Sequence, residues 1–183
     1  ESGEERAFNV FVGRADPEDE QRIGTQFNSQ NYIVAIEKPF LDIGLTVNGS
    51  GGPESVAFAD RVTEGNIRFT NNLDTKITDV EIIAEFSGNV FDIDAISPRE
   101  GFLDTNTQSV IWNKQTKNSL GTIDPGDTEE LVFNFSPLPF SETNIENPEI
   151  NINLSIRGRQ PSLGNSFQNI DNVVKKKVKF GKN

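Results

Sequence analysis

The chain of 183 residues contains no cysteine and no histidine. These absences exclude a disulfide, a thiolate nucleophile, a zinc site of the usual nitrogen and sulfur type, and a serine–histidine relay. Most hydrolase mechanisms are thereby removed, and we expect no catalytic residues. No apolar run approaches the roughly 20 residues that a membrane-spanning helix needs, so we expect no membrane insertion by this segment.

Methionine is absent as well, and basic residues are fewer than acidic ones. Without a starting methionine, we expect the chain to be a processed product or a fragment whose anchor lies in a segment outside it. Lys and Arg number 17 against 28 Asp and Glu, which gives a net charge of −11. This balance opposes contact with phosphate backbones and anionic lipids, so nucleic acid is not expected as a partner.

The large apolar residues are mainly phenylalanine, with 14 Phe against one Trp and one Tyr. Within Leu41–Val47 and Glu129–Phe135, apolar and polar residues alternate, which is the pattern of a strand with one buried face. Turn residues separate such segments, as in Asn71–Asp74 and Asp124–Asp127. The sequence predicts strands at Leu41–Val47, Ser55–Ala59, Asn66–Thr70, Thr78–Phe86, Val90–Ile93, Ser109–Asn113, Glu129–Phe135, Ile150–Ile156 and Asn172–Phe180.

Many short strands without persistent helical spacing indicate an all-β, immunoglobulin-like antiparallel β-sandwich over residues 38–183. Residues 1–37 add three strand candidates, Phe8–Val12, Ile23–Phe27 and Tyr32–Ile36. Two or three strands rarely bury enough apolar surface to be stable alone. We therefore expect residues 1–37 to be a β-strand segment that ends a preceding module.

One basic run, Lys175–Lys177 with Lys179, lies near the C-terminal end of the sequence. Val174, Val178 and Phe180 have one strand parity, whereas Lys175, Lys177 and Lys179 have the other. A solvated face or a protected edge strand is therefore favoured over a nucleic-acid or heparin patch.

Acidic residues supply the remaining candidate sites. Asp92 and Asp94 share a strand face and Asp104 follows, so together they could hold Ca²⁺, the one cofactor that the sequence leaves open. No Asp-x-Asp-x-Asp-Gly loop is present, and solvated loop acids are the alternative. Glu129 and Glu130 are adjacent and face opposite ways, so they do not form a glycosidase pair by themselves.

Two further possibilities concern single residues. Trp112 is expected in the core between the sheets rather than as a sugar-stacking platform, because carbohydrate modules usually expose several aromatic residues. No Ser-x-x-Lys occurs, which leaves a Ser–Lys dyad only between distant segments. A Lys–Asn cross-link within the domain stays open, since both residue types lie on neighbouring strand candidates.

The order of motifs between Asn66 and Pro137 is informative. A Trp-bearing strand runs into a leucine-glycine turn that ends in proline-glycine, with Ile123 where a second leucine is usual, before a Phe-rich strand. In this order the segment resembles the domain-of-unknown-function-11 (DUF11) or CARDB-like immunoglobulin-like modules of bacterial and archaeal surface proteins. The resemblance rests on Phe69–Asn72, Thr78–Ile82, Ser109–Asn113, Leu120–Asp127 and Leu131–Phe135.

The resemblance implies an extracellular or cell-surface module, often in tandem arrays, without shared catalytic residues. We therefore expect a non-catalytic structural or spacer module whose partners are neighbouring domains of the same polypeptide. The alternative is a ligand-binding or adhesion module for a glycan, a protein or Ca²⁺. It would use the loops Asn48–Pro53, Ala95–Thr107 and Lys114–Ser119, because loops on a rigid sandwich are where binding usually resides.

Overall fold

The computed structural model describes residues 4–36, 40–139, 145–161 and 167–181. The chain divides into two compact units, Glu1–Lys38 and Pro39–Asn183.

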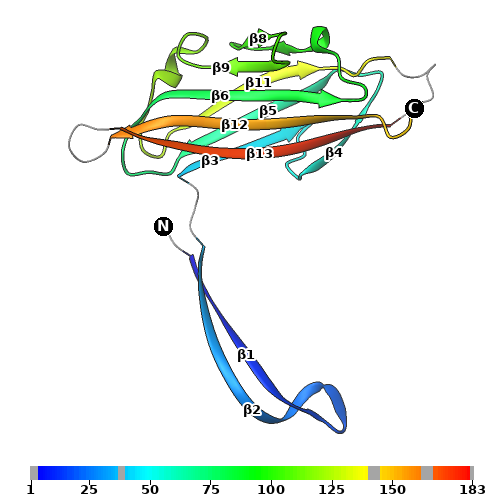
Figure 1. Ribbon diagram of the computed structural model, residues 1–183, viewed down its shortest axis with the longest axis vertical. Helices are drawn as coiled ribbons and strands as arrows, with labels where there is room; N and C mark the ends of the chain where they lie inside the picture. Colours follow the sequence, from blue (N-terminus) through cyan, green and yellow to red (C-terminus); the bar gives the residue numbers. More distant parts are fainter. Residues whose placement is uncertain (1–3, 37–39, 140–144, 162–166, 182–183) are drawn as a thin grey trace. The chain divides into compact units, whose positions relative to one another are not determined.

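The second unit is a sandwich of two sheets, which confirms the predicted all-β fold class (Figure 1). The larger sheet has the order β4 (Glu54–Phe58), β13 (Phe167–Gly181), β12 (Glu149–Pro161), β6 (Ile77–Gly88), β9 (Ser109–Trp112) and β8 (Phe102–Asp104), with β10 (Thr122–Ile123) also paired to β6. The smaller sheet has the order β3 (Leu41–Val47), β5 (Thr63–Asn71), β11 (Thr128–Phe135) and β7 (Ser97–Pro98). Two short 3₁₀ helices, η1 (Ile93–Ala95) and η2 (Asn118–Gly121), complete the unit.

The sandwich departs from a purely antiparallel one at β4. This strand pairs in parallel with β13, from Glu54 opposite Lys177 to Phe58 opposite Gly181. After β3 the chain turns at an isolated bridge between Val47 and Ser50 and crosses to the larger sheet. After this crossing, β4 lies beside β13 and runs in the same direction.

The core lies between the two sheets and follows the period-two pattern of the sequence. β3 buries Leu41, Ile43, Leu45 and Val47, and β12 buries every second residue from Ile150 to Ile156. Phe133 is central among the aromatic rings, because its centroid lies 5.5 Å from that of Phe86 and 6.0 Å from that of Trp112. Such edge-to-face and tilted contacts are favourable ring arrangements.

Trp112 is fully buried, which confirms the predicted core role. Its indole Nε1 donates a hydrogen bond of 3.0 Å to the carbonyl oxygen of Arg99, so the polar atom of the ring is satisfied. Gly101 passes close to the indole, and a Cβ at this position would lie 2.6 Å from Nε1. The connection before β8 is therefore shaped around the tryptophan.

The predicted turn at Asp124–Asp127 is confirmed, whereas the strand predicted at Val90–Ile93 is wrong. In the turn, Asp127 N donates to Asp124 O at 3.1 Å, and Gly126 has a φ of 80° that favours glycine. In the segment Val90–Ile93, the side chain of Asp92 instead caps the 3₁₀ helix η1. The apolar residues there were consistent with a strand, but the local Asx turn determines the backbone conformation.

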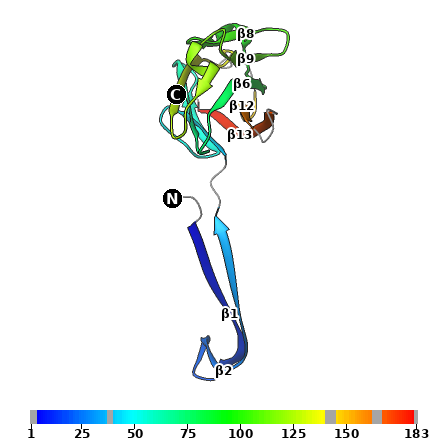
Figure 2. The same ribbon diagram turned by 90° about the vertical axis from the view of Figure 1, so that its left-hand side faces the viewer.

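The first unit is a hairpin of β1 (Glu4–Asp16) and β2 (Asp19–Ile36), which appears at the blue end of the chain in Figure 2. Two of the predicted strands, Ile23–Phe27 and Tyr32–Ile36, are parts of the single strand β2. Irregular pairing begins after Val12 and continues towards the turn. In the part of the chain that the structure describes, no helix has the length and apolar character needed to cross a membrane.

The burial of Trp112 leads to a stability prediction. We expect Trp112→Ala to lower the free energy of unfolding by about 3–5 kcal/mol, because it removes a large buried ring and leaves a cavity. Phe102→Ala is the matched control, since the Phe102 side chain is 58% exposed on the neighbouring strand β8. Denaturant titration should place the control within about 0.5 kcal/mol of the original chain. Equal losses in the two variants would contradict the core assignment.

Candidate functional site

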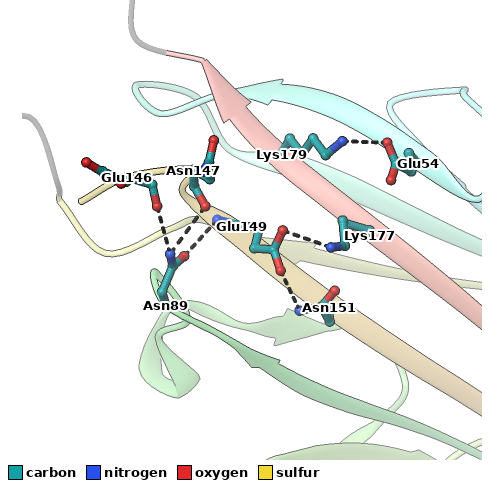
Figure 3. Close-up of polar contacts among 8 residues, drawn as sticks. All are labelled: Glu54, Asn89, Glu146, Asn147, Glu149, Asn151, Lys177 and Lys179. Atoms are coloured by element: carbon teal, nitrogen blue, oxygen red, sulfur yellow. Dashed lines mark hydrogen bonds and ion pairs between the residues drawn. The ribbon is translucent and has the colours of Figure 1, made fainter.

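The outer surface of β4, β12 and β13 carries a polar cluster, which we call the lysine–glutamate face (Figure 3). It consists of Glu54, Glu149, Asn151, Lys177 and Lys179. Lys179 Nζ lies 2.6 Å from a carboxylate oxygen of Glu54, and Lys177 Nζ lies 3.0 Å from one of Glu149. The other Glu149 oxygen accepts from Asn151 Nδ2 at 3.3 Å. Charges on three strands therefore compensate one another across the sheet.

The ionisation of this face follows from these contacts. The hydrogen bond from Lys179 is the main cause that holds the pKa of Glu54 below its usual value, and it raises the pKa of Lys179. The hydrogen bond from Lys177 likewise lowers the pKa of Glu149. A general acid needs a carboxyl whose pKa is raised towards neutrality. Both glutamates are shifted the other way, so neither carboxyl has the raised pKa of a general acid.

Asn89 holds the start of β12 at the edge of this face. Its Nδ2 donates to the carbonyl oxygens of Glu146 and Asn147, at 3.3 and 3.2 Å, and its Oδ1 accepts from Glu149 N at 2.8 Å. The preceding residue, Gly88, has a φ of 143°, which is strained for other residues. The side chain of Asn89 thus positions Glu149 for its contact with Lys177.

Lys176 points the other way, into the sandwich. Only 3% of its surface is exposed, and Nζ donates to Ser50 O at 2.6 Å and also to Gly52 O. Burial lowers the pKa of Lys176, because desolvation disfavours the charged form. The lysine thereby ties the connection between β3 and β4 to strand β13.

This geometry corrects the interpretation of the basic run. The alternate parity of Lys175, Lys177 and Lys179 is confirmed, but Lys176 shares the inward parity of Val178 and Phe180. β13 is also not an edge strand, because it lies between β4 and β12. The signal for a buried lysine was present in the sequence as its position in the alternation. The Lys–Asn cross-link within the domain stays a prediction. The buried amine of Lys176 donates hydrogen bonds to the backbone carbonyl oxygens of Ser50 and Gly52.

A shallow groove of about 650 Å³ lies over the ends of β6, β12 and β13. Its lining includes Asp79, Glu81 and Arg157. Glu81 is paired with Arg157, and Asp79 lies 2.6 Å from Lys114 Nζ. The hydrogen bond from Lys114 is the main cause that lowers the pKa of Asp79. Asp79 and Glu81, like the glutamates of the lysine–glutamate face, are already paired with neighbouring cations.

The structure does not bring Asp92, Asp94 and Asp104 together as a metal site. Asp92 Oδ1 accepts from the backbone N of Asp94 at 3.0 Å, and Asp104 Oδ1 accepts from that of Asn106 at 2.9 Å. The bond from Asn106 is the main cause that lowers the pKa of Asp104. Among the described residues, no group of three acidic side chains is placed to hold a metal ion. The carboxylates of Asp92 and Asp104 instead each close a local turn.

Glu129 and Glu130 lie on opposite faces of β11, as their adjacency predicts, and they do not act as a pair. A carboxylate oxygen of Glu129 forms an ion pair with Lys117 Nζ at 2.9 Å, and the same ammonium donates a hydrogen bond to the carbonyl oxygen of Glu130. Lys117 therefore fastens the loop Lys114–Ser119 to β11. Of the three loops predicted for binding, this one and Asn48–Pro53 are held to strands by lysine side chains.

Comparison with known proteins identifies no family for this chain. No family model matches the chain, and no curated protein matches it, so the resemblance to DUF11 or CARDB-like modules is not confirmed. A chain of a type I cohesin–dockerin complex from Clostridium thermocellum is similar in structure, with 9% identity, a TM-score of 0.45, and coverage of 80% of this chain and 96% of that one.

Two larger proteins match over part of their length. BcpA, the major pilin subunit of Bacillus cereus, has 9% identity and a TM-score of 0.44, with 93% of this chain and 47% of the pilin covered. A GH20 exo-β-N-acetylglucosaminidase from Vibrio harveyi has 10% identity and a TM-score of 0.38, with 78% of this chain but only 18% of the enzyme covered. The likeness to all three concerns the fold alone.

The buried amine of Lys176 generates a prediction about pH. In the alkaline range between its lowered folded pKa and its unfolded pKa, the unfolded chain binds more protons at this lysine, so stability rises with pH. We expect the unfolding free energy of the original chain, minus that of Lys176→Met, to increase from neutral to alkaline pH in denaturant titrations. The exposed Lys175 supplies the control variant Lys175→Met, whose difference should stay flat. A falling difference for Lys176→Met would refute the desolvated amine.

The separation of the three aspartates predicts the response to calcium. A ligand that binds only the native state raises the unfolding midpoint. Because the carboxylates of Asp92 and Asp104 are turned to backbone amides, we expect millimolar Ca²⁺ to leave the midpoint unchanged in a calorimetric scan. A rise of several degrees that is lost in Asp92→Asn would establish the calcium site after all. Mg²⁺ at equal ionic strength controls for screening.

Proposed function

We propose that residues 39–183 form a non-catalytic structural module that spaces neighbouring domains in a bacterial secreted or surface-anchored protein. The supporting observation is that its first and last strands run in the same direction along the sandwich. We infer that a force applied at the two ends would pass along these strands. The engagement of carboxylates on the lysine–glutamate face and in the groove favours bracing over catalysis.

The first and last strands run in the same direction. Leu41, at the start of β3, accepts a hydrogen bond of 2.7 Å through its carbonyl oxygen from Asn172 Nδ2 of β13. Further along both strands, Lys176 reaches Ser50, just beyond the end of β3. The chain therefore enters the sandwich beside Asn172 and leaves it after Gly181, about 30 Å further on at roughly 3.3 Å per residue.

Force applied at these two points acts along the strands. β3 is paired with β5 over its whole length, and β13 is paired with β12 on one side and β4 on the other. A pull parallel to a strand loads its ladder of hydrogen bonds together, whereas a pull across the strand breaks them one after another. Lys176 and Asn172 also join β13 to the connection around β3. This arrangement suits a module that transmits tension.

Ligand binding remains the second function to be tested. The loop Ala95–Thr107 differs from the other two proposed binding loops, because its residue Phe102 is largely exposed. A glycan or protein partner on that loop would be compatible with a spacer that also presents a surface. The partners that we propose first are the adjoining domains of the same polypeptide, with the anchor in a segment outside this chain.

The mechanical function can be tested by pulling in two directions. Because the chain lacks cysteine, handles introduced at positions 40 and 181 are unique. We expect single-molecule unfolding of the sandwich to need a higher force with handles at 40 and 181 than with handles at 48 and 181. The second pair places both handles towards the same end and peels the strands apart. Equal unfolding forces for the two handle pairs would contradict the mechanical function. Saturable binding of a glycan would favour the second function.

A further inference from the structure

The first hairpin, β1–β2, matches the strand pairing of the last hairpin, β12–β13, in the half that lies away from the turn. Phe8 is opposite Tyr32, Val10 is opposite Gln30, and Val12 is opposite Asn28. When each number is increased by 144, these pairs become Ile152 opposite Lys176, Leu154 opposite Val174, and Ile156 opposite Asn172, which are the observed pairs of β12 and β13. One constant offset therefore maps Glu5–Val12 and Asn28–Ala35 onto the corresponding part of the last hairpin, whereas the pairing of β1 with β2 shifts after Val12 and that of β12 with β13 does not.

Some residues at equivalent positions agree in character, whereas others differ, as Arg6 with Ile150 and Gln30 with Val174. Five are identical at this offset, as Glu5 with Glu149, Asn9 with Asn153, Pro17 with Pro161, Asn28 with Asn172, and Val34 with Val178. The apolar positions Phe8, Val10 and Val12 correspond to Ile152, Leu154 and Ile156, which are all at most 1% exposed in the sandwich. The register and the pattern thus identify which face of the first hairpin is built for burial.

That face has no cover within its own unit. Phe8, Val10 and Val12 are 52%, 47% and 58% exposed, and Tyr32 beside them is 48% exposed. Both outer edges of a two-stranded ribbon also present unpaired backbone groups, and such a ribbon is marginally stable alone. In the sandwich, the equivalent hairpin has both edges paired, because β12 pairs with β6 and β13 pairs with β4.

We propose that the first hairpin is the closing hairpin of a preceding copy of this same module. Its face of Phe8, Val10, Val12 and Tyr32 packs into the core of that copy, between strands equivalent to β6 and β4. Asn28 there takes the role that Asn172 has here, where it donates to the carbonyl oxygen at the start of β3. The repeat length is 144 residues. This inference deepens the proposed spacer function, because it names the neighbour as a second copy and explains how the copies are joined.

The test supplies the missing copy in front of the complete chain. Residues 39–144 are fused directly before Glu1, so that residues 1–37 follow in the place of residues 145–181. We expect hydrogen exchange at the amides of Phe8–Val12 to slow by about 100-fold or more relative to the 183-residue chain, as it does when a segment joins a cooperative core. The hairpin peptides are unique in the fused chain, so mass spectrometry follows them without ambiguity.

Two variants of the fused chain distinguish the faces. Phe8 and Phe11 are equally exposed in the single chain, but Phe11 lies on the opposite face, where its equivalent is Ser155. We expect Phe8→Asn to abolish the new protection and Phe11→Asn to retain it. Equal loss in both variants would overturn the proposed face. Protection that appears in the 183-residue chain as its concentration rises would also overturn the proposal, and would assign the hairpin to self-association.

A reference chain keeps the test decisive if folding is poor. In it, residues 145–181 replace residues 1–37 of the fused chain, so that both copies carry the closing hairpin observed here. If the reference forms two modules and the fused chain forms one, the equivalence of the hairpins is refuted. The pulling experiment loads only the segment between positions 40 and 181, so a failure there would remove the spacer function and leave the repeat intact, and the reverse also holds.

Discussion

The β12–β13 hairpin is the element on which the rest of the sandwich depends. It lies inside the larger sheet, with β6 on one side and β4 on the other, so the sheet is divided without it. Its inward face provides Ile150, Ile152, Leu154 and Ile156 from β12 and Lys176, Val178 and Phe180 from β13. Because these strands come last in the unit, the sheet can close only when residues far apart in the sequence have met. Long-range pairing of this kind makes folding slow relative to helical proteins.

The polar residues of the module act around this hairpin. Lys177 and Lys179 connect its outer face to Glu149 and Glu54, whereas Lys176 secures the connection between the sheets from within. Exposed ion pairs contribute little each, typically below about 1 kcal/mol. Their value here is geometric, because they set three strands side by side and leave the carboxylates neutralised. A protein surface arranged in this way is suited to persistence and transmission of load.

Much of this fold could be predicted from alternation alone. The strand Leu41–Val47, the turn Asp124–Asp127 and the burial of Trp112 each follow from local residue patterns that the tertiary structure confirms. Parallel pairing of β4 with β13 could not be predicted, because strand direction across a sheet depends on the chain crossing between layers. The sequence pattern predicts a site of Asp92, Asp94 and Asp104, but the backbone amides of Asp94 and Asn106 donate to the carboxylates of Asp92 and Asp104. Its charge predicts that Lys176 is exposed like the neighbouring lysines, although its place in the alternation of β13 indicates the core.

The proposal that equivalent hairpins are packed in a core at the end of the chain and uncovered at its start can be tested most directly by native-state hydrogen exchange of the 183-residue chain. Residue by residue, NMR would compare amides of Phe8–Val12 with those of Ile152–Ile156. The account predicts that the second set exchanges only through global unfolding of the sandwich, while the first exchanges by opening of an isolated ribbon. Equal protection of the two sets in a monomer would contradict it, because the first hairpin would then be stable without the core that we assign to it.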